Sequence, residues 1–139
     1  ADSSPMQARR ARVLLAEDDD DVRYALERLL SRAGYEVVAV HSGGAVLEHL
    51  GAALLLKQWQ EAPDVIVTDV RMPGVTGLEL LEGVRQSGWR VPVVVVTAFG
   101  DAELRARAMA LGAAAFLDKP LDGPELEHAV AAALEAGAS

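Results

Sequence analysis

A short apolar segment that ends at an acidic residue constrains the fold of this chain more than any other stretch. Residues 65–67 are Val-Ile-Val, a β-branched run typical of a strand buried on both faces. The run leads to Asp69, and Pro-Gly at 73–74 predicts a turn shortly afterwards. In an open parallel α/β sheet, ligands bind outside the carboxyl ends of the strands, so Asp69 is expected at the mouth of a crevice. The alternative for a single aspartate at a strand end is a capping role in a loop.

Strand-like and helix-like segments alternate along the rest of the chain. Apolar runs predict strands at 13–16, 36–40, 65–67, 91–97 and 114–117. Apolar residues at helical spacing predict five helices, which begin near residues 20, 43, 76, 101 and 122. This alternation predicts an α/β fold, with a five-stranded parallel sheet covered by helices on both faces. We expect a short tail over 1–10 and one domain over 11–137.

Five consecutive acids at 17–21 follow the first predicted strand. Such a run is usually a solvated surface stretch, but its position at a strand end places it beside the expected crevice. Asp20 is predicted to be the N-cap of the next helix, which leaves Glu17 and Asp18 to face the crevice. Asp101 is predicted to cap a later helix, and Asp122 is predicted to open the last helix with a capping box.

The segment 51–60 is apolar around more than one face. It predicts either a long apolar helix or a helix broken at Gly51. Two interpretations of the extension from Ala52 to Trp59 also stay open. It is a partner surface, or it is extra helix that covers the edge of the domain.

Composition excludes several classes of protein. The net charge of −8 argues against a basic nucleic-acid-binding face. The chain has no cysteine, which excludes a disulfide framework and fits a reducing compartment. Because no apolar run is long enough to span a bilayer, we expect no membrane segment and no signal peptide. A cytoplasmic location is therefore expected.

Polar residues end four of the predicted strands and are expected to meet at one edge of the sheet. They are Glu17, Asp18, Asp69, Thr97 and Lys119. Three nearby carboxylates repel one another unless a cation joins them, and Mg²⁺ prefers such oxygen ligands. The three histidines are scattered and are expected at the surface.

Lys119 is unusual because the chain has only two lysines but eleven arginines. A compact ammonium suits a phosphate oxygen or a carboxylate in a tight site. A residue before proline favours an extended backbone, which carries Lys119 directly out of its strand. The alternative for a single lysine is an ordinary surface position.

Together these motifs resemble the receiver domain of two-component response regulators. The resemblance rests on Glu17-Asp18, Asp69 with Met72-Pro73-Gly74 and Gly77, Thr97-Ala98, and Lys119-Pro120. It covers about residues 11–137 and is greatest to receivers of σ54-activating, NtrC-type regulators. It implies a CheY-like, flavodoxin-like fold with the strand order 2-1-3-4-5.

The resemblance also implies a role for each site residue. Asp69 would accept a phosphoryl group, Thr97 and Lys119 would contact that group, and Phe116 would be the switch aromatic. Mg²⁺ would be held by Glu17, Asp18, Asp69 and the backbone carbonyl of Arg71. The implied partners are a sensor histidine kinase, a C-terminal output domain and a second copy of the chain on phosphorylation. The implied activity is that of a self-modifying switch and not of a turnover enzyme.

Two departures from the family pattern and three alternatives accompany this interpretation. Glu17 stands where aspartate is commoner, and the segment between Gly44 and Pro63 is longer than usual by about two helical turns. A phosphate-independent binding module is one alternative. An aspartate-nucleophile phosphohydrolase is a second, although Arg71 occupies the position where such enzymes carry a second acid. A nucleotide-binding fold is disfavoured because no glycine-rich phosphate loop follows any strand.

Overall fold

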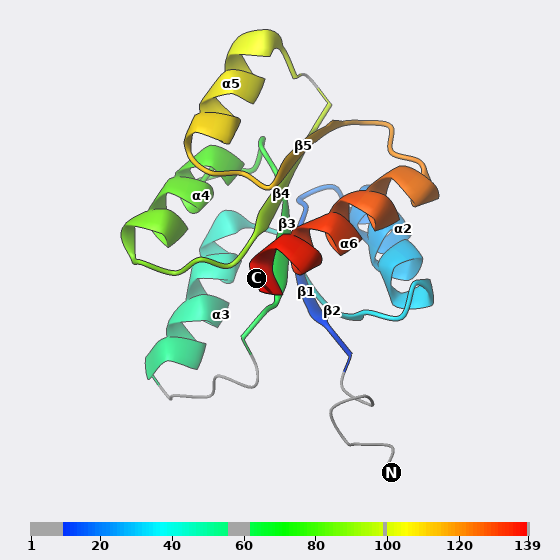
Figure 1. The fold of residues 1–139 in the computed structure, drawn as a ribbon, viewed down its shortest axis with the longest axis horizontal. Helices are drawn as coiled ribbons and strands as arrows, with labels where there is room; N and C mark the ends of the chain where they lie inside the picture. Colours follow the sequence, from blue (N-terminus) through cyan, green and yellow to red (C-terminus); the bar gives the residue numbers. More distant parts are fainter. Residues whose placement is uncertain (1–9, 56–61, 99, 139) are drawn as a thin grey trace.

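A parallel five-stranded sheet lies at the centre of the structure, with helices on both of its faces (Figure 1). The computed structural model describes residues 10–55, 62–98 and 100–138. The strands are β1 (Arg12–Ala16), β2 (Glu36–Val40), β3 (Val65–Asp69), β4 (Val93–Thr97) and β5 (Ala115–Asp118). The helices are α2 (Asp20–Arg32), α3 (Gly43–Leu55), α4 (Gly77–Gln86), α5 (Ala102–Ala110) and α6 (Gly123–Ala138). The strand order β2-β1-β3-β4-β5 confirms the predicted fold class and order.

Each face of the sheet has its own apolar core, because successive strand residues point to opposite faces. Helices α3, α4 and α5 cover one face, where Leu14, Ile66 and Val95 contribute from the strands. Helices α2 and α6 cover the other face, where Leu15 and Val94 contribute. The valine-rich strands β3 and β4 are buried along their whole length, as the unbroken apolar runs predict.

Helices α4 and α5 are buried to very different extents. Helix α4 buries five residues, and Thr76 and Glu79 close its first turn with a complete capping box. Helix α5 is shorter and buries only Ala108. The two neighbouring helices therefore differ greatly in how firmly packing holds them.

The register of the central strands aligns their carboxyl ends. Asp69 pairs with Val96, and Thr97 pairs with Asp118. Two backbone hydrogen bonds continue this alignment into the loops, from Val70 N–H to the Val96 carbonyl at 3.0 Å and from Lys119 N–H to the Thr97 carbonyl at 2.8 Å. The residues that follow β1, β3, β4 and β5 therefore emerge at the same edge.

The predicted caps are largely correct, with one shift. Asp19, and not Asp20, is the N-cap of α2, because Asp19 has an extended backbone and its side chain accepts the Val22 N–H. Asp20 is already in the first helical turn. The cap predicted at Asp101 is confirmed, since its side chain accepts the Leu104 N–H. The Asp122 side chain accepts the Glu125 N–H, which is one of the two hydrogen bonds of the predicted capping box.

Helix α3 continues through Gly51, so the interpretation with a helix break at that residue is wrong. A mid-helix glycine costs about 1 kcal/mol, and burial of Val46, Leu50 and Ala53 on the same helix offsets this cost. The rest of the predicted extension, over 56–59, lies outside the described residues, as does most of the predicted tail. None of the described helices is both long and apolar enough to cross a membrane.

Candidate functional site

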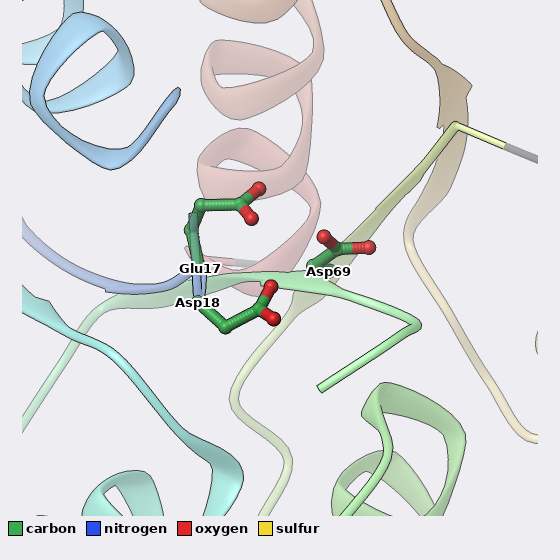
Figure 2. A group of neighbouring side chains, drawn as sticks. All are labelled: Glu17, Asp18 and Asp69. Atoms are coloured by element: carbon green, nitrogen blue, oxygen red, sulfur yellow. The ribbon is translucent and has the colours of Figure 1, made fainter. Parts of the chain in front are cut away.

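Three carboxylates meet at the carboxyl edge of the sheet (Figure 2). Glu17 and Asp18 follow β1, and Asp69 is the last residue of β3. One carboxylate oxygen from each lies within 4.8 Å of those of the other two. Glu17 and Asp69 are buried, with 1% and 7% of their surface exposed, whereas Asp18 is exposed. The sequence prediction that these three acids gather is therefore confirmed.

Lys119 joins two of these acids. Its Nζ donates to Glu17 Oε1 at 2.6 Å and to Asp69 Oδ2 at 2.8 Å. Burial by itself acts to lower the pKa of Lys119, but the hydrogen bonds to Asp69 and Glu17 outweigh it and raise the pKa above its usual value. Lys119 is therefore firmly charged, and the alternative of an ordinary surface lysine is wrong.

Glu17 is held by contacts to both of its carboxylate oxygens. Oε1 accepts from Lys119, and Oε2 accepts the backbone N–H of Asp19 at 3.1 Å. Burial raises the pKa of Glu17, and the hydrogen bonds from Lys119 and Asp19 only partly oppose this effect. Glu17 is therefore fixed at both carboxylate oxygens, beside the ammonium of Lys119.

The backbone around Asp69 is fixed by the start of α4. The Gly77 N–H donates to the Val70 carbonyl at 2.9 Å, and a Cβ at Gly77 would overlap the Asp69 carbonyl. The Asp69 side chain accepts the Arg71 N–H at 3.2 Å through Oδ1. Only glycine lets α4 approach this closely, and the approach sets where the Asp69 carboxylate lies.

Thr97 and Phe116 lie on the same side of adjacent strands, since Phe116 pairs with Val95, two residues before Thr97. Thr97 is fully buried and Phe116 is 4% exposed. A Cβ at Gly100 would lie 2.9 Å from both Thr97 Cγ2 and Phe116 Cε1, so the two side chains border the same loop. The Arg105 guanidinium lies over the Phe116 ring, 4.9 Å from its centroid. The ring is therefore already buried here, which favours the interpretation of Phe116 as a core residue in this state.

Arg23 also reaches this edge, and the sequence analysis did not identify it. Its guanidinium donates to the backbone carbonyl of Glu17 at 3.0 Å. A contact to a main-chain carbonyl leaves no pattern in a sequence. The only available signal is the spacing of three residues from Asp20, to which Arg23 also donates.

The family described as the response regulator receiver domain matches residues 13–131. FixJ of Azorhizobium caulinodans, a transcriptional regulatory protein, is 43% identical over 88% of this chain and 54% of its own length. NtrC of Escherichia coli K12, a DNA-binding transcriptional regulator, is 36% identical over 88% of this chain and 24% of its own length. The chain thus spans about half of one relative and a quarter of the other.

A solved structure agrees with these matches. The signal receiver domain of an HD-domain-containing protein from Pseudomonas fluorescens Pf-5 superposes with a TM-score of 0.81 at 25% identity. The superposition covers 94% of this chain and 98% of that one. The predicted similarity to NtrC-type regulators is confirmed by the NtrC match. The family match, the curated relatives and the solved structure lead to one conclusion: this chain belongs to the response regulator receiver domain family.

Proposed function

We propose that this receiver is a phosphorylation-dependent switch in which Asp69 accepts a phosphoryl group from a phosphohistidine of a sensor histidine kinase. The observation that carries the proposal is the placement of Asp69. Its carboxylate ends the central strand, lies beside two further acids and accepts a hydrogen bond from Lys119. A buried nucleophile with a cation within hydrogen-bond distance suits transfer of a highly charged group.

The transfer needs little covalent chemistry from the protein. A carboxylate oxygen of Asp69 attacks the phosphorus in line, a P–O bond forms, and the P–N bond of the phosphohistidine breaks with its electron pair left on the imidazole. Lys119 donates to a phosphoryl oxygen in place of one of its present carboxylate partners. The Thr97 hydroxyl donates to another. Both contacts stabilise charge on the transferred group.

The donor set at this edge fits Mg²⁺. Three carboxylates face one ammonium, so the site keeps an excess of negative charge that a hard divalent cation matches. Glu17, Asp18, Asp69 and the backbone carbonyl of Arg71 would hold the ion. When bound, the ion offsets negative charge on the phosphoryl oxygens.

The product is an acyl phosphate, and its hydrolysis returns Asp69 to the free carboxylate. The domain therefore acts as a timed switch, and turnover of a substrate is not its task. We propose that the signal leaves through Thr97 and Phe116 toward α5, β5 and α6, where an output domain or a second copy of the chain is the partner.

Acetyl phosphate with Mg²⁺ tests the acceptor directly. Intact mass spectrometry should show one added phosphoryl group on the wild-type chain and none on Asp69→Asn. Asp122→Asn is the matched control, because asparagine caps a helix as well as aspartate, and it should be labelled like the wild type. Undiminished labelling of Asp69→Asn would refute the assignment. An unlabelled wild type that still binds its kinase would favour a phosphate-independent module.

A further inference from the structure

Arg23 connects the first turn of α2 to the loop that carries Glu17 and Asp18. One nitrogen, Nη1, donates to the Glu17 carbonyl at 3.0 Å, and the other, Nη2, donates to Asp20 Oδ1 at 2.6 Å. Only 13% of the Arg23 side chain is exposed, although 59% of the surface of the next residue, Tyr24, faces solvent. The guanidinium also lies 5.5 Å from the centroid of the Tyr24 ring, so this ring and the loop both cover it and it is not extended into water.

The Glu17 carbonyl belongs to the peptide that joins Glu17 to Asp18. Other contacts already fix Glu17, whose N–H donates to the Val40 carbonyl at 3.1 Å and whose side chain binds Lys119. Asp18 has an exposed side chain, and the orientation of this peptide sets the backbone position from which that side chain extends. Arg23 therefore acts on the one acid of the three that burial does not hold in place.

The second contact of Arg23 engages an acid of the same run. Asp20 lies three residues from Arg23 on the helix, and its carboxylate is occupied by the guanidinium. Arginine makes both contacts at once because its planar guanidinium presents two donors in a fixed fork. Lysine, as a single point donor, satisfies one of them at a time.

We infer that Arg23 is a positioning residue for the cation site formed by Glu17, Asp18 and Asp69. It holds the Glu17–Asp18 peptide so that the Asp18 carboxylate faces the other two, and it contacts neither the cation nor the phosphoryl group. The inference rests on the proposed function in one respect, that the cation at this edge is the one used for phosphorylation. Residues that orient metal ligands from behind typically change metal affinity about 10- to 100-fold when they are removed.

The charge of Arg23, taken alone, predicts the opposite change in Mg²⁺ affinity. Arg23 is a cation near a cation site, so its removal by itself should tighten Mg²⁺ binding. A positioning role predicts weaker binding instead. The sign of the change therefore separates positioning from simple electrostatics.

The experiment is isothermal titration calorimetry of Mg²⁺ into the phosphate-free chain. Arg23→Gln should bind Mg²⁺ about tenfold more weakly or worse. Arg23→Lys keeps the charge but loses the fork, and it should also bind more weakly. Arg28→Gln is the matched control, since it removes the same charge from an exposed position on the same helix; it should bind as tightly as the wild type or slightly more tightly. Urea unfolding in metal-free buffer shows which variants are folded. If Arg23→Gln does not fold, the Mg²⁺ affinity of Arg23→Lys provides the test.

A second readout separates this inference from the proposed function. Labelling of Asp69 by acetyl phosphate should need about tenfold more Mg²⁺ in Arg23→Gln and should reach a wild-type rate at saturating Mg²⁺. Unchanged or tighter Mg²⁺ binding by Arg23→Gln and Arg23→Lys would overturn the role of Arg23. Labelling of wild-type Asp69 would then leave the proposed function intact. Conversely, a wild type that is never labelled refutes the proposed function, and calorimetry still decides the role of Arg23.

Discussion

Replacement of Lys119 by methionine isolates the energetics of the site. Methionine retains much of the length and the apolar stem but removes the ammonium that bridges Glu17 and Asp69. Both acids are buried, with 2% and 8% of their side chains exposed. The variant therefore leaves two buried carboxylates at short range without the cation that joins them.

Removal of one member of a buried ion pair typically costs about 3–5 kcal/mol. The Lys119 side chain is itself 17% exposed, so water can reach the space it leaves. We therefore expect the free energy of unfolding to fall by an amount near the lower end of this range, about 3 kcal/mol at pH 8. At the few degrees per kcal/mol typical of a chain of this length, the Tm should fall by about 10 °C.

The loss should depend on pH in a defined direction. The hydrogen bond and charge of Lys119 lower the pKa of Glu17, so their removal raises further a pKa that burial already raises. A carboxyl whose pKa is raised in the folded state contributes to stability at pH values below its pKa in the unfolded chain, which is near 4.5. That contribution is lost as the pH rises through the pKa of the folded state. The difference in the free energy of unfolding between the variant and the wild type should therefore be small near pH 4.5 and reach its full size at pH 8.

Urea unfolding at both pH values, with and without Mg²⁺, measures this gap. Mg²⁺ should stabilise Lys119→Met more than the wild type, because a divalent cation replaces the missing positive charge. Arg32→Met, which removes a cation from an exposed position, is the control and should change stability little. A loss of the same size at both pH values, or no loss at all, would refute the reasoning.

Three further outcomes are expected. Asp18→Ala should lose Mg²⁺ binding and phosphorylation, yet melt higher than the wild type in metal-free buffer because like-charge repulsion is relieved; a lower Tm would contradict this. Gly77→Ala should lower both stability and labelling of Asp69, since its Cβ would overlap the Asp69 carbonyl, whereas Gly83→Ala on the same helix meets open space and should stabilise by about 1 kcal/mol in urea unfolding. Crystal structures with and without beryllofluoride, a phosphoryl mimic, should differ in the Phe116 rotamer and the position of α5; an unchanged ring and helix would establish Phe116 as a permanent core residue.

The sequence predicts the structure best where a regular apolar pattern ends at residues with a specific chemistry. The β-branched runs of β3 and β4 predict buried parallel strands, and the acids and Lys119 at the strand ends predict their meeting at one edge. These inferences hold because strand register follows from burial and leaves few alternatives.

Local choices among similar residues were harder to predict. Any acid of the run 17–21 can cap a helix, so the shift from Asp20 to Asp19 depends on where the backbone turns helical. The continuation of α3 through Gly51 depends on tertiary burial that outweighs local propensity. The contact of Arg23 with the Glu17 carbonyl depends on a main-chain atom whose position only the fold supplies.

The unequal burial of α4 and α5 has a consequence for how the domain opens. The free energy needed to detach an element locally scales with the apolar surface it buries. Helix α4 buries five residues, whereas α5 buries Ala108 and packs Leu104 only partly against the core. We therefore expect α5 to leave the sheet more readily than α4, and the amide hydrogens of α5 should exchange before those of α4. A few kcal/mol can thus reposition α5, while the core on the opposite face of the sheet, to which α5 contributes no residue, stays intact.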